Sequence, residues 1–497
     1  MLNTIIFTPF IAAIVIAIFA HQKNGIARIA SLSICTLTFF FILGIAFSLS
    51  DIISTVTVSR PWIQSLGITY QLALDGFSLV MILVSTFIAM MSVLVAWQSI
   101  HRWDIFGPLL LMTLSGLLGV FLARDMILFY VFWEVMLIPL YFMLTQWGSQ
   151  QSHHAATRFL LYTITASLFM LIGIICLYIQ VGRDTGVYSF AFTHLLAAPL
   201  SDNSLWIFLA LFIGFAVKVP LFPLHLWAPD TYKEAHPAVT ILLSGAMANA
   251  GVYGILRICT FVSPLSLTTL SNTIMGLAAT GAIYTGLIAY QQNNLRSVAA
   301  YSSISHMNLA IMAIFAMQLQ AINGSMLQLV AHALSITGIF AIIAMLAARG
   351  FDGELDEMGG LFKPMPKLGA MLLFFFIASA GLPGLGNFAS EILILVGSYQ
   401  TSPLWAAFAA ISIVIGIAYF LRCYERAMLG PIITSSIEPD NKTHTHLSDL
   451  HWREMTLLSL LVIAILWLGI SPDTFLQPLH NAVTHIIEYN VNALRGH

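Results

Sequence analysis

Long apolar stretches, separated by short polar turns, run through almost the whole chain. A helix needs about 20 consecutive apolar residues to cross a bilayer, and many of these stretches reach that length. The pattern predicts an all-α integral membrane protein, a single polytopic domain over 1–497 with about 14 transmembrane helices. We expect them, to within about 2–4 residues, near 2–20, 29–49, 77–97, 107–123, 126–146, 159–180, 205–227, 238–258, 271–290, 299–318, 324–347, 368–399, 404–428 and 455–474.

Helices 7 and 12 of this series are predicted to be broken. The seventh contains AVKVPLFPLHLWAPD, with Pro220 and Pro223, and the twelfth is too long for one helix and contains GLPGLGNF around Pro383. Proline removes a backbone donor and clashes with the preceding turn, and irregular backbone at membrane depth survives only inside protein or beside a wet cavity. Two similar breaks five spans apart predict two inverted five-helix repeats, over 107–258 and 271–428.

Composition excludes several classes of protein. The chain is 59% hydrophobic and 8% charged, which is far from a soluble domain, and its net charge of -2 offers no basic field for nucleic acid. The four cysteines are far apart and show no metal-binding spacing. We therefore expect no cofactor and no metal in this chain, and no binding of nucleic acid. Those cysteines are Cys35, Cys176, Cys259 and Cys423.

The two ends of the predicted bundle differ in basic charge. Most Lys and Arg residues fall on one side if the N-terminus lies outside, and basic loops mark the inner side of a membrane. Both termini are therefore expected on the outer side. The first apolar stretch has its lysine after the apolar run, the reverse of a secretory signal, so we expect it to remain as the first span.

Two charged residues fall deep inside predicted spans. Glu134 lies in LFYVFWEVMLIPLYF, near the middle of the fifth span, and Lys218 directly precedes the break of the seventh. An ionisable group in the bilayer centre costs about 3 kcal/mol or more, so it must be paired, wetted or functional. A buried carboxyl bound to a neighbouring helix or a lysine reaching the interface are the structural alternatives. We interpret Glu134 as the ion-pair partner of a nearby base, and Lys218 as a group that stores and releases a proton.

Further titratable residues lie in the second half. His306 in AAYSSISHMN and His332 in QLVAHALSITG belong to the tenth and eleventh spans, and Glu391 follows the twelfth span's break as Lys218 adjoins the seventh's. Histidine titrates near physiological pH and can pass a proton through either ring nitrogen. Heme ligation and helix contacts are the alternatives for the histidines. His225 in PLFPLHLW is a weaker relay candidate that equally suits a structural role in the break.

These segments resemble the antiporter-like subunits of respiratory complex I, NADH-quinone oxidoreductase, and most of all its subunit M, also called chain 4. The resemblance extends over about 100–430, in family order. The matching strings are FLARDMILFYVFWEVMLIPLYF, AVKVPLFPLHLWAPDTY, AAYSSISHMN, LVAHALS, LDEMGGL and ASAGLPGLGNFASE.

The resemblance implies a proton relay of Glu134, Lys218, His306, His332 and Glu391, driven by electron transfer in other subunits. It implies as partners the other membrane-arm subunits of complex I, including paralogous antiporter-like chains, together with the lipid bilayer and protons. The location implied is the bacterial inner (plasma) membrane, with both termini periplasmic. One position departs from the family: Asn249 stands where a bridging lysine is usual, and asparagine can order water but cannot hold a proton.

Two further functions are compatible with this pattern. The chain also resembles ion-translocating subunits of membrane-bound hydrogenases, multisubunit cation/proton antiporters and inorganic-carbon uptake complexes, which gene neighbours or co-purifying chains would distinguish. Alternatively it is a structural membrane-arm subunit whose relay is impaired at Asn249. The presence of Glu134, Lys218 and Glu391 favours an active relay.

Overall fold

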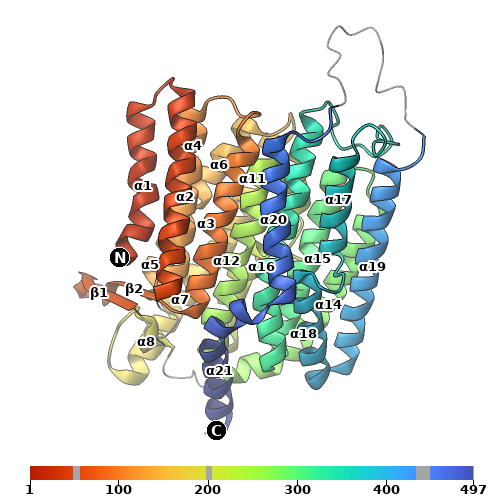
Figure 1. Cartoon of the computed structure of the whole chain (residues 1–497). Coiled ribbons are helices and arrows are strands. Elements are labelled where there is room, and N and C mark those ends of the chain that lie inside the picture. The colour runs from red at the N-terminus through yellow and green to blue at the C-terminus, as the bar shows by residue number, and fades with distance from the viewer. Residues whose placement is uncertain (49–55, 197–203, 432–447, 496–497) are drawn as a thin grey trace.

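A bundle of long, nearly parallel helices makes up most of the protein (Figure 1). The structure is a computed structural model that describes residues 1–48, 56–196, 204–431 and 448–495. Within these ranges, 12 helical segments are long and apolar enough to cross a membrane, and α9 (Leu205–Lys218) and α17 (Pro366–Ser379) are shorter apolar helices. The predicted helical membrane fold is confirmed, while the total of 14 spans and the inverted repeats remain predictions.

The helices follow one another up and down the bundle. The elements up to the first break are α1 (Leu2–Phe19), α2 (Asn24–Ser48), β1 (Val56–Ile63), η1 (Gln64–Leu66), β2 (Ile68–Leu74), α3 (Gly76–Ala96), α4 (Trp103–Leu122), α5 (Met126–Val135), α6 (Leu137–Trp147), α7 (Ser152–Thr185), α8 (Phe192–Leu195) and α9. Those after it are α10 (Ala228–Glu234), α11 (Pro237–Leu242), η3 (Leu243–Met247), α12 (Ala248–Gly254), η4 (Ile255–Cys259), α13 (Thr260–Val262), α14 (Pro264–Gln291), α15 (Leu295–Phe315), α16 (Leu319–Ala347), α17, α18 (Gly386–Thr401), α19 (Pro403–Met428), α20 (Trp452–Ile470) and α21 (Asp473–Arg495).

Both predicted breaks are present. Helix α9 ends at Lys218, just before Pro220, and the chain resumes helical structure only at α10. Helix α17 ends at Ser379 and α18 begins at Gly386, with Gly381 and Gly384 at φ of +76° and +89° between them. These left-handed backbone conformations suit glycine, which has no Cβ to clash.

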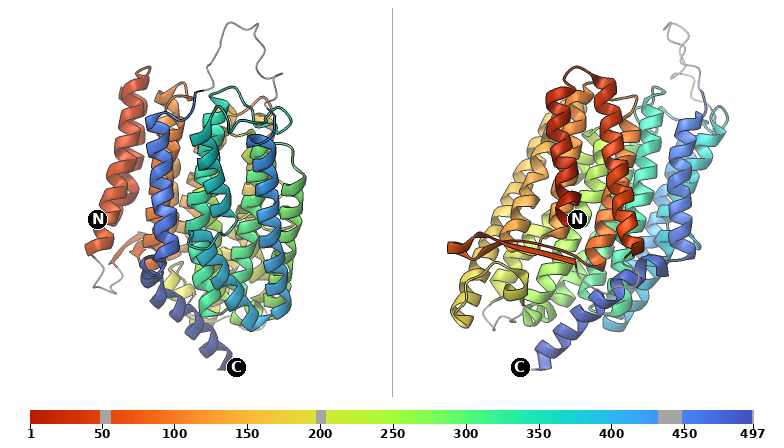
Figure 2. Two further views of the ribbon diagram at one scale, coloured as in Figure 1. Left: turned by 45° about the vertical axis from the view of Figure 1, so that its right-hand side comes forward. Right: turned by 60° about the vertical axis from the view of Figure 1, so that its left-hand side comes forward.

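One end of the bundle carries elements that the pattern of spans did not predict. Strands β1 and β2 form an antiparallel hairpin, with Ser59 opposite Gln71, and the hairpin lies across the ends of the helices (Figure 2). Helix α21 runs obliquely over the same end and buries Leu479, Val483 and Ile486 against the bundle. We call this end, which also holds both termini, the hairpin face. These elements are too short or too polar to resemble membrane spans, so the hydropathy pattern did not predict them.

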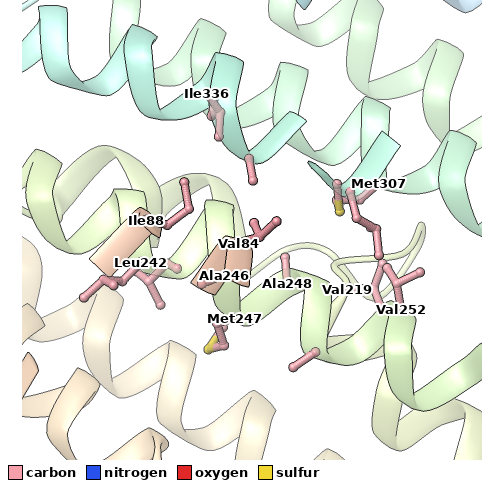
Figure 3. Packing of buried hydrophobic residues seen from close by; sticks show 14 of the residues in the cluster. Val84, Ile88, Val219, Leu242, Ala246, Met247, Ala248, Val252, Met307 and Ile336 are labelled. Atoms are coloured by element: carbon pink, nitrogen blue, oxygen red, sulfur yellow. The ribbon is translucent and has the colours of Figure 1, made fainter. Parts of the chain in front are cut away.

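The most enclosed part of the bundle is the helical segment 237–262, made of α11, η3, α12, η4 and α13. Its membrane-length window is 100% buried inside the protein. Val84 and Ile88 of α3, Met307 of α15 and Ile336 of α16 pack around it (Figure 3). Segments η3 and η4 are π-helical, a conformation that often occurs at functional sites. The sequence alone predicted a plain helix here.

Candidate proton-transfer site

Lys218 is an enclosed cation at the end of a helix. Its side chain is 2% exposed, and its Nζ makes no hydrogen bond within the described residues. Two features favour its positive charge. The carbonyl end of α9 carries partial negative charge, and Nζ lies 3.6 Å from the centroid of the Trp133 ring, a cation–π contact. The predicted placement of Lys218 directly before the break is confirmed.

Glu134 adjoins this lysine from α5. It follows Trp133 in the chain, is half-buried, and has a buried Oε1 without a hydrogen-bond partner in the described ranges. Its charge acts electrostatically on Lys218, although the two form no ion pair within 4.0 Å among those residues. The structure therefore places the predicted partners near one another without a direct ion pair in the described ranges, and Lys218 Nζ instead contacts the ring of Trp133, the residue before Glu134.

His306 and Glu391 meet in the second half of the chain. His306 Nδ1 lies 3.7 Å from Glu391 Oε1 and 3.1 Å from Gln328 Nε2, and His306 Nε2 lies 3.4 Å from Ser379 Oγ. All of these groups are buried. Ser379 is the last residue of α17, so the second break directly adjoins the histidine.

The break also makes room for the carboxyl group of Glu391. A Cβ placed on Gly381 would lie 2.2 Å from Glu391 Oε2, closer than real contacts allow. Ser390, next to Glu391 on α18, donates a hydrogen bond to the side-chain oxygen of Gln328. The side-chain nitrogen of the same Gln328 lies against His306. The glycine, the break and α16 together hold the carboxyl group beside the histidine.

His332 continues the row toward the centre of the bundle. Its ring centroid lies 5.4 Å from that of His306. Its Nε2 lies 3.0 Å from Ser303 Oγ, and Ser303 Oγ lies 2.8 Å from Ser244 Oγ. Ser244 belongs to the π-helical segment η3. We call the row of Ser244, Ser303, His332, His306 and Glu391 the lateral row.

Asn249 lies on the central segment one π-turn beyond Ser244. Its Nδ2 donates to the carbonyl oxygens of Gly245, at 3.0 Å, and Leu329, at 3.4 Å. Its Oδ1 is buried and has no hydrogen-bond partner within the described ranges. A free acceptor in such a place can orient a water molecule, which is the role expected for asparagine at this position.

Several polar members of the site were not predicted from sequence. They carry no charge, so intramembrane charge in the sequence does not point to them. These residues are Ser244, Ser303, Gln328 and Ser379. His225, the weaker candidate, instead packs in the first break, its ring centroid 5.7 Å from that of Phe222 and 6.0 Å from that of Tyr284. This contact fits its structural role in the break.

A second polar group, the arginine cluster, lies at the hairpin face. Asp75 caps α3 and forms ion pairs with Arg124, at 3.1 Å, and with Arg257. Arg124 also donates to Ser78 Oγ, at 3.0 Å, and to the Tyr253 hydroxyl, at 3.2 Å. Burial alone would raise the pKa of Asp75, but Arg257 and Arg124 outweigh burial and hold it well below its usual range. The burial of both arginines with an aspartate was not predicted from the sequence.

The titratable residues of the described chain do not form a metal-binding cluster of three or more His, Cys, Asp or Glu side chains. The site is instead a set of hydrogen-bonding and ionisable groups at the level of the two breaks. Such a set can relay protons between side chains and ordered water.

Comparison with known proteins places this geometry in a family. Residues 123–416 match the family model described as "NADH:quinone oxidoreductase/Mrp antiporter, TM". This matched range includes every member of the lateral row. The chain belongs to this family. It is 35% identical over 441 residues to NADH-quinone oxidoreductase subunit M of Escherichia coli strain K12, covering 87% of this chain and 86% of that protein. It is 32% identical to NADH-ubiquinone oxidoreductase chain 4 of Arabidopsis thaliana, covering 98% and 97%.

Two solved structures have the same fold as this chain. A chain of respiratory complex I from Thermus thermophilus with bound NADH superimposes with a TM-score of 0.88 at 28% identity, covering 99% of this chain and 100% of that one. A chain of the Mrp complex from Dietzia sp. DQ12-45-1b has a TM-score of 0.86 at 18% identity and shares the fold alone. The expected resemblance to subunit M and chain 4 is confirmed.

Proposed function

We propose that this chain is the proton-translocating, antiporter-like membrane subunit M of an NADH:quinone oxidoreductase. The observation that carries the proposal is the lateral row, in which buried serine, histidine and glutamate side chains follow one another from the central helix to the second break. Such a row costs folding free energy in an apolar bundle, so a replaceable structural role does not account for it.

Glu134 and Lys218 supply the variable charge in this proposal. Two opposite unit charges about 4–8 Å apart interact by about 2–4 kcal/mol at an effective dielectric of about 20. Moving one charge against 100 mV requires about 2.3 kcal/mol, so separating the pair changes the free energy of a proton on Lys218 by the required order. A proton released by Lys218 crosses on water oriented by Asn249, enters the lateral row at Ser244, and reaches Glu391.

The remaining assignments are also part of the proposal. Electron transfer takes place in other subunits, and this chain carries no redox centre, cofactor or metal of its own. Its partners are the other membrane-arm subunits, including paralogous antiporter-like chains. We place it in a bacterial inner membrane with the hairpin face and both termini periplasmic, because Lys and Arg residues are concentrated in the loops of the opposite face.

Replacement of Glu134 tests the proposal. Glu134→Gln keeps the shape of the side chain but removes the charge that acts on Lys218. We expect the assembled variant complex, in sealed vesicles, to pump fewer protons per NADH oxidised and to lose coupled quinone reductase activity. The control is Glu425→Gln, which removes an exposed carboxylate on α19 and is expected to change neither quantity. Normal pumping by a fully assembled Glu134→Gln complex would refute the assignment.

A further inference from the structure

The central segment 237–262 carries polar side chains toward the hairpin face as well as toward the lateral row. Ser244, Asn249, Tyr253 and Arg257 follow one another at intervals of five, four and four residues. A π-helical turn closes over five residues and an α-helical turn over about four. The five-residue step falls at η3 (Leu243–Met247), which is π-helical, and Arg257 lies in the second π-helical segment, η4 (Ile255–Cys259). The four residues therefore follow one another along the segment, and their contacts show what each of them faces.

The polar contacts of these residues run from the bundle centre to its edge. Ser244 bonds to Ser303 of the lateral row, and Asn249, which is 1% exposed, has an Oδ1 without a hydrogen-bond partner among the described residues. The Tyr253 hydroxyl donates to the Phe121 carbonyl oxygen at 2.9 Å and accepts from Arg124. Arg257 then pairs with Asp75. Along the central segment, Asn249 therefore lies between Ser244, where the lateral row begins, and Tyr253, which contacts the arginine cluster at the hairpin face.

The arginine cluster, on the Tyr253 side of Asn249, carries an excess of positive charge. Two guanidinium groups face one carboxylate, and every member is buried or half-buried. Two arginines for one aspartate leave a net charge of +1. A fixed cation in a narrow, poorly solvated passage raises the electrostatic energy of an entering proton, the means by which pores exclude protons and cations.

We propose that the arginine cluster is an electrostatic barrier that stops protons at Asn249 from escaping to the hairpin face and so directs them into the lateral row. Arg124 and Arg257 supply the repelling charge, Asp75 holds both in place, and Tyr253 anchors Arg124 to the central segment. This assignment rests on the proposed function, since it concerns the same proton path. It predicts that removal of either arginine opens a leak.

The leak is measured without turnover. The intact complex is reconstituted in sealed vesicles, a potential is imposed without NADH, and passive proton entry is followed. We expect Arg257→Gln to raise passive conductance by about tenfold, the factor that accompanies a barrier lowered by about 1.4 kcal/mol. Arg257→Lys keeps the charge and should stay near the wild-type value. Arg124→Gln keeps the Asp75–Arg257 pair and should leak like Arg257→Gln, which provides a second test if one variant fails to assemble.

Two controls separate a specific leak from a damaged bundle. Arg158→Gln removes the exposed pair with Asp230 at the opposite face and should not leak. Adding Asn249→Leu to Arg257→Gln should return the conductance to the wild-type value, because the path loses its polar link. Assembled arginine variants with wild-type conductance, or a leak that persists in the double variant, would overturn the barrier. A leak that Asn249→Leu abolishes, in a protein whose Glu134→Gln variant pumps normally, would refute the proposed function and leave the barrier standing.

Discussion

Ser303, on α15, makes polar contacts with both the central segment and α16. Its hydroxyl lies within hydrogen-bond distance of both Ser244 and His332, so it joins η3 to α16 through α15. A hydroxyl can donate and accept at once, and by rotating it can serve either neighbour. That property suits a position between a serine and a histidine whose ring nitrogens change roles with protonation.

We therefore expect Ser303→Ala to slow proton transfer with little effect on assembly. Leaving a buried polar partner unsatisfied costs about 1–3 kcal/mol, which corresponds to about a fivefold or larger effect on a step that needs the contact. The measurement is protons pumped per quinone reduced, in vesicles. Ser305→Ala is the matched control, because Ser305 is buried on the same helix but bonds only the Ala282 carbonyl oxygen in the described residues. Equal pumping by the two variants would remove Ser303 from the path.

At this scale the charged members of the site were predictable and its uncharged members were not. Lys218, Glu134 and Glu391 stand out in apolar surroundings, because a buried charge is costly wherever it occurs. Serine occurs throughout helical bundles and often bonds its own preceding turn, as Ser31 does with the Ala27 carbonyl oxygen. Whether a serine such as Ser303 bonds its own helix or bridges two others depends on packing that the sequence does not display.

The second break acts as one element in which backbone shape and side-chain placement are coupled. Gly381 and Gly384 both have positive φ, but they differ in surroundings. A Cβ on Gly381 would collide with the Glu391 carboxyl group, whereas a Cβ on Gly384 would meet no atom within 4 Å. The two glycines therefore share a backbone requirement and differ in their relation to the lateral row.

This difference gives a matched pair of substitutions. Gly381→Ala and Gly384→Ala each place a Cβ in the left-handed region, at a cost of about 1–2 kcal/mol. Only Gly381→Ala also displaces the Glu391 carboxyl group from His306. We expect both variants to unfold at a slightly lower temperature, while only Gly381→Ala loses proton pumping. If the two pump equally, or if Gly384→Ala loses more, close packing at Gly381 does not position Glu391.

The breaks themselves were predictable as elements, since Pro220 and the GLPGLG segment interrupt otherwise continuous apolar runs. The exact helix ends beside the breaks and the shape of the neighbouring central segment were less predictable. The predicted broken span 205–227 does not show by itself that the first helix ends at Lys218, and the π-helical turns of the central segment have no signature in hydropathy. A π-turn differs from an α-turn by one residue, and it changes which helices the following side chains meet: Ser244 contacts α15 and Asn249 contacts α16.

For the whole molecule, the membrane-crossing bundle follows from apolar content, while the hairpin face does not. The hairpin spans 56–74 and α21 alternates apolar and polar residues, so neither resembles a membrane span. The hairpin and α21 both pack against the ends of helices that are distant from them in the sequence. The backbone of α21 at Pro478 approaches Gly76 so closely that a Cβ there would lie 1.7 Å from the Pro478 carbonyl oxygen. Only the assembled bundle creates this surface.

Helix α21 is therefore expected to depend on its buried apolar face for its position. Val483→Asp places a charge where the side chain is fully buried, whereas Asn481→Asp adds the same charge to the exposed side of the same helix. An unpaired charge in an apolar contact costs several kcal/mol, so Val483→Asp should release α21 from the bundle. We expect amide hydrogen exchange over Asp473–Arg495 to quicken by at least about tenfold in Val483→Asp and to stay near wild type in Asn481→Asp. Similar protection in the two variants would mean that contacts other than the Leu479, Val483 and Ile486 face hold α21 in place.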